Sequence, residues 1–350
     1  MEKVSAINLD KDERMLVTWD IGRRCNFDCS YCESTRHNTY SPPTAYENLI
    51  NTFDFIKDYS NLYNKNVNLS FTGGEPTVNP RFWDLVKHVK ENSNFEISLT
   101  SNGTWPEKHQ QFIRDNFVGV TVSWHTEGPI VSKKRAIKNA VDLHQAGLWT
   151  TVNVMLHTDN WQESVETYNY LKDQGVRTFP VIIGDGVRER TDWFEDTEGV
   201  LRRTSHLYTP EQVDWFWKEK GIEQKLSKKI MSGTDVGRGC CGGRCLKGKV
   251  GNEWKPVSLV DNHFKDWFCK VNYYFLHVEE HTRNVFHHQT CQATFTGRGA
   301  IGSLDNTESI LLNVKNYLEN PKPIVCPNER CGCGTCVPKA KDYVDYLLLT

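Results

Sequence analysis

The sequence lacks any long apolar run. Its first residues, MEKVSAINLDKDERMLV, carry charges where a signal peptide needs an apolar segment, and no later stretch approaches the roughly 20 apolar residues of a membrane span. We therefore expect a soluble, cytoplasmic protein with no membrane partner.

The sequence also lacks a large net charge, internal repeats and low-complexity tracts. Its 42 Lys and Arg residues nearly balance its 44 Asp and Glu residues, which leaves a formal net charge of -2. No strong overall field draws such a chain to nucleic acid or to an anionic membrane. We therefore expect no nucleic acid polymer as a partner, although a nucleotide remains a candidate substrate.

Cysteine is missing from the long stretch between Cys32 and Cys240, and the 12 cysteines lie in two groups, one on each side of this stretch. Three lie at positions 25, 29 and 32, and the other nine lie between positions 240 and 336. An even number of cysteines is typical of a secreted protein held by disulfides, but a secreted protein should carry a signal sequence, which is missing here. In a reducing compartment, clustered cysteines favour metal or iron–sulfur ligation.

The region from residue 14 to residue 184 alternates short β-like runs with amphipathic stretches of helical length. This order is typical of a parallel α/β domain, and it gives six β/α units. The predicted strands are 15–21, 66–71, 95–100, 118–124, 149–156 and 176–183. The predicted helices begin near residues 44, 80, 107, 131 and 160, and a sixth follows the last strand after a longer loop.

Two helix starts carry capping-box spacing. Thr44 precedes Glu47 by three positions, and Thr209 precedes Gln212 by three with Pro210 at the first helical position. The apolar residues that follow recur at helical spacing, which predicts helix faces packed on a sheet.

Past residue 230 the sequence becomes dense in glycine and cysteine. MSGTDVGRGCCGGRCLKG precedes a hairpin-like segment bounded by Cys269 and Cys291, and CPNERCGCGTC follows it. The change predicts two domains, an α/β domain of residues 1–230 and a small Cys-rich domain of residues 231–350 that is held partly by metal.

The segment CNFDCSYC places Cys25, Cys29 and Cys32 directly after the first predicted strand. Three thiolates at this spacing can wrap one face of a cubic [4Fe–4S] cluster and leave one iron without a protein ligand. The alternative is a zinc site completed by His37 or by a remote cysteine. The position at the carboxyl end of a strand in a β/α array favours an active site, and FTGGEP at the end of the second strand supports this interpretation.

These motifs resemble those of the radical S-adenosylmethionine (SAM) superfamily. CNFDCSYC matches its CxxxCxxC motif, with the aromatic Tyr31 before the third cysteine, and GGEP at 73–76 matches its glycine-rich motif after the second strand. TSNGT at 100–104 and VNVM at 152–155 resemble two further segments of that superfamily.

The resemblance implies a partial (β/α)6 TIM-like barrel and a radical mechanism. Cys25, Cys29 and Cys32 would hold a [4Fe–4S] cluster whose open iron binds the amino and carboxylate groups of SAM. Reductive cleavage of SAM would give methionine and a 5′-deoxyadenosyl radical that abstracts hydrogen from the substrate. A reductant such as flavodoxin or ferredoxin would supply the electron.

The resemblance also implies residues around SAM. The candidates are Tyr31, Gly73, Gly74, Glu75, Asn102, Ser123 and Asn153. The two glycines allow the backbone to approach a ligand closely, and Glu75 offers a carboxylate to the SAM ammonium group. The last three lie near strand ends, where a turn or strand-end cap is an equal alternative. Polar residues after the fourth, fifth and sixth strands are candidates for contacting the substrate, namely His125, Glu127, His157 and Asp185.

The later cysteines resemble the auxiliary-cluster extensions called SPASM and, in their shorter form, twitch. In the short form two cysteines flank a hairpin and two come from a later CxxC, which here would be Cys269, Cys291, Cys333 and Cys336 around one [4Fe–4S] cluster. The longer form has a different spacing, so one auxiliary cluster is favoured over two. Further candidate ligands, for a second cluster or a zinc site, are Cys240, Cys241, Cys245, Cys326 and Cys331.

Three functions follow as hypotheses. The first is a radical SAM oxidoreductase or epimerase that acts on a small molecule, with the auxiliary cluster handling an electron. The second is a maturase of peptide or protein side chains, which is disfavoured because the 24 residues before Cys25 are too few for a separate leader-peptide-binding domain. The third is a zinc- or cluster-stabilised binding protein without catalysis.

Overall fold

The computed structural model describes residues 4–9, 14–32, 35, 37–183, 193–195, 201–203, 208–219, 231–232, 246–258, 264–289, 291–328 and 337–349. The chain divides into two compact units. The α/β unit comprises Trp19–Ile50 and Leu69–Ser227, and the Cys-rich unit comprises Met1–Thr18, Asn51–Asn68 and Lys228–Thr350. Each unit is described separately below.

The α/β unit contains the ends of β2 and β3 and all of β4 to β7. These strands lie in the order β2-β3-β4-β5-β6-β7, and β4 to β7 pair in parallel. Their bounds are β2 (Arg14–Asp20), β3 (Asn66–Thr72), β4 (Glu96–Ser101), β5 (Gly119–Trp124), β6 (Trp149–Leu156) and β7 (Arg177–Ile182). All six predicted strands are confirmed, each to within one residue at either end.

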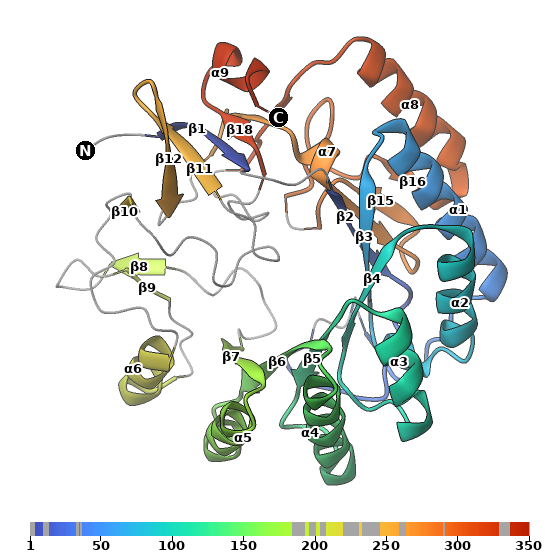
Figure 1. The fold of residues 1–350 in the computed structure, drawn as a ribbon, viewed down its shortest axis with the longest axis vertical. Coiled ribbons are helices and arrows are strands. Elements are labelled where there is room, and N and C mark those ends of the chain that lie inside the picture. The colour runs from blue at the N-terminus through green and yellow to red at the C-terminus, as the bar shows by residue number, and fades with distance from the viewer. Residues whose placement is uncertain are drawn as a thin grey trace. The chain divides into compact units, whose positions relative to one another are not determined.

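Helices alternate with these strands, which is the arrangement of a partial TIM-type barrel. They are α1 (Tyr46–Leu62), α2 (Phe82–Asn92), α3 (Gln110–Asn116), α4 (Ile130–Gln145), α5 (Trp161–Asp173) and α6 (Pro210–Glu219), with 3-10 turns η1 (Pro76–Val78) and η2 (Glu107–His109) and the strand pair β8 (Trp193–Glu195) and β9 (Leu201–Arg203). Helix α4 packs on β5 and β6, and α5 packs on β6 and β7. Figure 1 shows α2 to α5 along the outer side of these strands.

The two faces of the parallel sheet differ in polarity. Val122 and Val154 are fully buried on one face, whereas Thr121, Ser123 and Asn153 are only partly buried on the other. Ser123 lies opposite Asn153 in the register of β5 and β6. Because strand side chains alternate between faces, the inner face of the sheet carries hydroxyl and amide groups. It therefore offers polar contacts to a ligand.

The two predicted capping boxes have different outcomes. At α6 the N–H of Gln212 donates to the Thr209 hydroxyl oxygen at 3.3 Å and the N–H of Thr209 donates to Gln212 Oε1 at 3.0 Å, which confirms the box. Helix α1 begins two residues after Thr44, whose hydroxyl donates to the carbonyl of Ile21 at 2.6 Å. Thr44 thus ties the start of α1 to the end of β2.

The Cys-rich unit contains a sheet of short antiparallel strands. Their order is β10-β12-β11-β1-β18-β13-β17. The bounds are β1 (Val4–Leu9), β10 (Met231–Ser232), β11 (Leu246–Val250), β12 (Glu253–Ser258), β13 (Phe268–Cys269), β17 (Ile324–Val325) and β18 (Lys339–Ala340). Strand β1, which the sequence analysis did not predict, pairs antiparallel with β11 and β18.

The hairpin predicted between Cys269 and Cys291 is confirmed. Strands β14 (Phe275–Glu279) and β15 (Asn284–Phe286) pair antiparallel. The remaining elements of this unit are α7 (Val271–Tyr274), β16 (Gly302–Ser303), η4 (Leu304–Asn306), α8 (Thr307–Glu319) and α9 (Tyr343–Leu347). None of the described helices is long and apolar enough to span a membrane.

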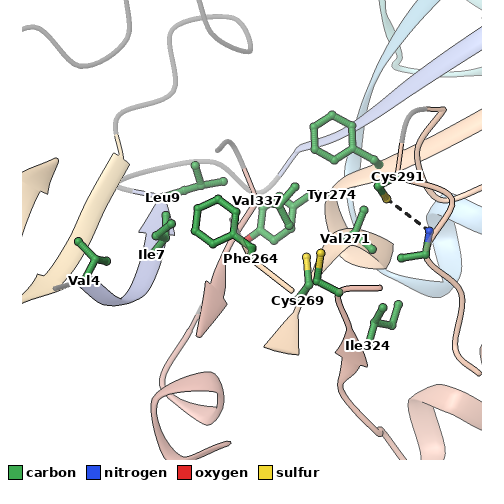
Figure 2. Packing of buried hydrophobic residues seen from close by; sticks show 13 residues of the cluster. Val4, Ile7, Leu9, Phe264, Cys269, Val271, Tyr274, Cys291, Ile324 and Val337 are labelled. Atoms are coloured by element: carbon green, nitrogen blue, oxygen red, sulfur yellow. Dashed lines mark hydrogen bonds between the residues drawn. The ribbon is translucent and has the colours of Figure 1, made fainter. Parts of the chain in front are cut away.

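One apolar cluster, here called the Cys-rich core, joins distant segments of this unit. Its buried members are Val4, Ile7, Leu9, Phe264, Cys269, Val271, Tyr274, Phe275, Cys291, Ala293, Ile324, Cys326 and Val337. Figure 2 shows Cys269 and Cys291 among these side chains. Three cysteines are therefore part of a hydrophobic core.

Candidate active site

The first cysteine group lies on the loop after β2, here called the cysteine loop (residues 22–32). At its base the N–H of Cys25 donates to the carbonyl of Asn38 at 2.8 Å, and the N–H of Asn38 donates to the carbonyl of Arg23 at 2.9 Å. Cys29 is buried, Cys25 is partly exposed and Cys32 is exposed. The loop is anchored at its base and presents one thiol to solvent.

The thiols lie close enough to influence one another. Burial is the main cause that raises the pKa of Cys25 to about 11 and that of Cys29 to about 12, and the nearby Cys32 contributes a smaller part of both shifts. Iron binds the thiolate form, so positively charged iron offsets the cost of ionising these groups. The soft donor set therefore fits an iron–sulfur cluster. Among the described residues no three Cys, His, Asp or Glu side chains surround a single metal ion, whereas a cubic cluster takes thiolates at separate corners.

The GGEP segment after β3 is bonded to the cysteine loop through its backbone. The N–H of Gly74 donates to the carbonyl of Gly22 at 2.7 Å, and the N–H of Glu75 donates to the carbonyl of Arg24 at 2.8 Å. These bonds place the two motifs side by side, as the ends of neighbouring strands require.

Both glycines of this segment are needed for that contact. A Cβ on Gly73 would lie 2.6 Å from Oδ1 of Asp20, and a Cβ on Gly74 would lie 2.4 Å from the carbonyl oxygen of Arg23. Gly73 also has a φ of +133°, which other residues rarely adopt. The sequence analysis gave the glycines a contact with a ligand, and the structure adds this close contact with backbone.

Glu75 is buried and bonded within the protein. Its Oε1 accepts from the hydroxyl of Ser101 at 2.7 Å and from the N–H of Thr77 at 3.1 Å, and its Oε2 accepts from the N–H of Asn102 at 2.7 Å. Burial raises the pKa of Glu75, and these hydrogen bonds act in the opposite direction. The carboxylate therefore joins the end of β3 to the end of β4.

Asn102 belongs to a closed set of side-chain hydrogen bonds. Its Nδ2 donates to Oδ1 of Asn26 at 2.7 Å, its Oδ1 accepts from the hydroxyl of Thr104 at 2.6 Å, and Nδ2 of Asn26 donates to that hydroxyl oxygen at 2.9 Å. Asn26 lies between Cys25 and Cys29 in the chain. The end of β4 is thereby bonded to the cysteine loop.

The second half of the cysteine loop contacts residues that follow β5 and β6. Ser30 donates its N–H to Oε2 and its hydroxyl to Oε1 of Glu127, each at 2.6 Å. The Tyr31 hydroxyl lies 2.5 Å from Nδ1 of His125, and the two rings stack at 5.8 Å between centroids. His157 Nε2 lies 3.3 Å from Oε1 of Glu127.

Burial controls the charge of this group. It lowers the pKa of His125 to about 4, so the ring is neutral at pH 7, and it raises the pKa of Tyr31, which stays protonated. A neutral imidazole and a phenol make a hydrogen bond without net charge.

Three of the four predicted substrate residues thus meet at the cysteine loop, namely His125, Glu127 and His157. The fourth, Asp185, lies outside the described residues. Ser123 and Asn153 lie next to each other on the inner face of the sheet. Sequence reasoning did not single out Asn26, Ser30, Ser101 and Thr104, although the first two lie inside the cysteine motif and the last two inside the TSNGT segment.

The second cysteine group is described only in part. Cys269, Cys291 and Cys326 are buried in the Cys-rich core, and the N–H of Ala293 donates to Sγ of Cys291 at 3.4 Å (Figure 2). The other predicted ligands lie outside the described residues, namely Cys240, Cys241, Cys245, Cys331, Cys333 and Cys336.

Strand register places Cys326 and a lysine beside Cys269. The N–H of Cys326 donates to the carbonyl of Trp267 at 2.8 Å, so Cys326 lies opposite the residue two before Cys269, on the same face of the sheet. Lys339 lies directly opposite Cys269, is 1% exposed, and has its Nζ 4.4 Å from the ring centroid of Phe264. Two thiols and a buried ammonium group therefore share one region of the core.

Curated relatives match part of the chain. A probable GTP 3′,8-cyclase of Methanococcus aeolicus is 32% identical over 137 residues, which are 38% of this chain and 44% of that protein. The GTP 3′,8-cyclase of Limosilactobacillus fermentum is 26% identical over 182 residues, which are 48% of this chain and 54% of that protein. The chain thus spans about half the length of the curated relatives it matches.

Solved structures match over a longer range at low identity. Native anSMEcpe with bound AdoMet and Cp18Cys peptide is 15% identical with a TM-score of 0.47, and the match covers 87% of this chain and 82% of that one. Streptococcus suis SuiB is 12% identical with a TM-score of 0.47, over 84% of this chain and 65% of that one.

The model of the Radical SAM superfamily matches residues 19–197, about half of the 350 residues. The matched range contains the cysteine loop, the GGEP segment and the polar inner face of the sheet. Members of this superfamily use a [4Fe–4S] cluster and SAM and need an external reductant. The chain belongs to the radical SAM superfamily of enzymes.

Proposed function

We propose that Cys25, Cys29 and Cys32 hold the cluster that cleaves SAM, and that the enzyme oxidises or epimerises a small molecule. The observation that carries this proposal is that the loop with the three cysteines is hydrogen-bonded to the GGEP segment through the carbonyl groups of Gly22 and Arg24. Such a loop supplies soft ligands at the carboxyl end of a barrel strand, where this fold binds its substrates.

When bound, the cluster supplies one electron that cleaves SAM to methionine and a 5′-deoxyadenosyl radical. The protein's own residues orient SAM. Gly73 and Gly74 give SAM access to backbone, and Oε2 of Glu75, which accepts one hydrogen bond from Asn102, has a second lone pair for an ammonium group. Tyr31 lies beside the third cysteine of the loop.

The inner face of the sheet favours a polar substrate of low molecular mass. Thr121, Ser123 and Asn153 present uncharged hydroxyl and amide groups that are partly exposed. Ser123 and Asn153 are proposed to contact SAM, which leaves the hydroxyl of Thr121 for a polar substrate. A nucleotide is one such molecule, and GTP is the probe that the names of the curated relatives suggest.

We further propose an auxiliary [4Fe–4S] cluster in the Cys-rich unit. Its ligands are Cys269, Cys291, Cys333 and Cys336, and Cys326 is an alternative ligand because it lies beside Cys269. The ammonium group of Lys339 supports the proposal, since a buried cation is favoured by anionic thiolates nearby. Fully ligated by protein, this cluster would accept an electron from the substrate radical.

Deuterium transfer tests the substrate class. The enzyme is reconstituted anaerobically, reduced with dithionite and given SAM. It then receives either the metabolite fraction or the peptide fraction of an extract from cells grown in deuterated water. A separate reaction contains deuterated GTP. We expect deuterium in 5′-deoxyadenosine from the metabolite fraction. Transfer from peptides alone would make the enzyme a maturase, and purified protein that holds zinc without iron or sulfide would make it a binding protein.

A further inference from the structure

Glu127 is bonded to the middle of the cysteine loop through both carboxylate oxygens. Its Oε2 accepts the N–H of Ser30 and its Oε1 accepts the hydroxyl of the same residue, each at 2.6 Å. Hydrogen bonds to a carboxylate are among the stronger ones in proteins, and a pair of them fixes direction as well as distance. Ser30 lies between Cys29 and Cys32, so this pair restrains the segment that carries two of the three thiols.

His157 holds the carboxylate in place. The N–H of Asp159 donates to Nδ1 of His157 at 3.2 Å, which leaves the ring proton on Nε2. This Nε2 lies 3.3 Å from Oε1 of Glu127. Oε1 therefore receives one donor from the loop and one from the residue after β6, and the side chains of His157 and Glu127 are only 17% and 21% exposed.

The next residue of the loop is restrained independently. Tyr31 is hydrogen-bonded to His125 at 2.5 Å and stacks on its ring, and Phe27 packs edge-on against the same imidazole at 6.0 Å. The part of the loop between Cys25 and Cys32 is thus held from the end of β5 by two adjacent contacts. Glu127 directs both of its carboxylate oxygens at the loop, and it is therefore placed to orient the cluster ligands.

We propose that Glu127 is a positioning residue, which fixes the Ser30 segment so that Cys29 and Cys32 present their thiolates to the SAM-cleaving cluster. His157 orients Glu127 in this role. The proposal rests on the ligand assignment made above for the cysteine loop, and it replaces the substrate contact that the sequence analysis gave to Glu127 and His157. Outer groups that orient metal ligands commonly tune the metal site as well.

The first test uses the protein without cluster. Hydrogen exchange at the Ser30 amide is compared in the wild type, Glu127→Ala, Glu127→Gln and Glu163→Gln. Glu163 is the matched control, because its carboxylate pairs with Lys133 at 2.5 Å on the outer helices. We expect about tenfold faster exchange in Glu127→Ala, an intermediate rate in Glu127→Gln, which keeps one acceptor oxygen, and no change in the control.

The second test uses the reconstituted enzyme and two readouts other than turnover. Glu127→Ala should release iron to a ferrous chelator about tenfold faster than the wild type and should change the electron paramagnetic resonance spectrum of the reduced cluster with SAM, with partial rescue in Glu127→Gln. A Ser30 amide that exchanges equally fast in all four proteins overturns the proposal, and so does an unchanged spectrum with unchanged iron release. A wild-type enzyme that holds a full cluster yet yields no 5′-deoxyadenosine would contradict the proposed function instead. The exchange experiment would still report whether Glu127 restrains Ser30, because it uses protein without cluster.

Discussion

Cys25, Cys29 and Cys32 lie on a loop held by polar contacts, whereas Cys269, Cys291 and Cys326 lie inside an apolar core. The loop carries one exposed and one partly exposed thiol, while the three described cysteines of the core are all buried. Hydrogen bonds from neighbouring strand ends orient a loop without covering it, so its open side can receive a small molecule. Close packing fixes a thiol and excludes solvent at the same time. This difference is the one expected if, as proposed above, the first group belongs to an open catalytic site and the second to a closed auxiliary site.

Removal of the first group should have the largest effect. Replacing Cys25, Cys29 and Cys32 together by Ala should abolish SAM cleavage and leave about four irons per chain, by the stoichiometry of one remaining cubic cluster. Iron and sulfide analysis after reconstitution measures this. About eight remaining irons would show two auxiliary clusters. No remaining iron would show that the Cys-rich unit holds no cluster.

The close backbone contact of the open site gives a second prediction. Gly73→Ala should lower the free energy of unfolding by about 1–3 kcal/mol more than Gly147→Ala, because a Cβ at position 73 meets Asp20 and Gly22 at 2.6 Å whereas one at position 147 meets nothing within 4 Å. Gly147 also has a positive φ, of +83° against +133° at Gly73, so the control accounts for part of the backbone cost of a side chain and the remaining difference includes the crowding. Urea titrations measure it, and equal losses would show that GGEP does not need this contact.

A buried histidine in the Cys-rich unit gives a third prediction. Burial lowers the pKa of His287 to about 3, so the unfolded chain binds more protons than the folded chain between about pH 6.5 and pH 3. The contribution of neutral His287 to stability is complete above about pH 6.5 and is lost as the pH falls, with a slope of up to about 1.4 kcal/mol per pH unit.

His287→Gln removes this titration. The free energy of unfolding of the wild type should fall between pH 7 and pH 5 by about 2 kcal/mol more than that of the variant. Urea titrations at the two pH values give both differences. Parallel pH dependences would mean that His287 accepts a proton without cost, which is inconsistent with an apolar environment.

Lys339 gives the smallest expected effect and tests the closed site directly. Lys339→Met removes a positive charge opposite Cys269, which makes addition of an electron to the auxiliary cluster less favourable. We expect the midpoint potential to move in the negative direction on the order of 60 mV, which is a tenfold change for one electron. Lys341→Met, at an exposed position two residues away, is the control. Identical potentials in both variants would place the cluster away from Cys269.

Local sequence signals predicted most of the barrel. The six strands and the Thr209 capping box are patterns within a few residues, and each is present in the structure. Strand β1 escaped prediction because its partners, Leu246–Val250 and Lys339–Ala340, lie more than two hundred residues away in the chain. Glu75 and Glu127 were named from the sequence as candidate site residues, and both lie beside the cysteine loop. Their partners Ser101 and Ser30 could not be predicted, because they are set by how strand ends meet in space.

Formation of 5′-deoxyadenosine from SAM tests the central claim most directly. The reconstituted wild type, reduced with dithionite under anaerobic conditions, should form it, and the variant in which Cys25, Cys29 and Cys32 are all Ala should form none while keeping the iron of the auxiliary site. Equal formation by the two proteins, or none by a wild type that carries a complete cluster, would contradict the assignment of the open site to the cysteine loop.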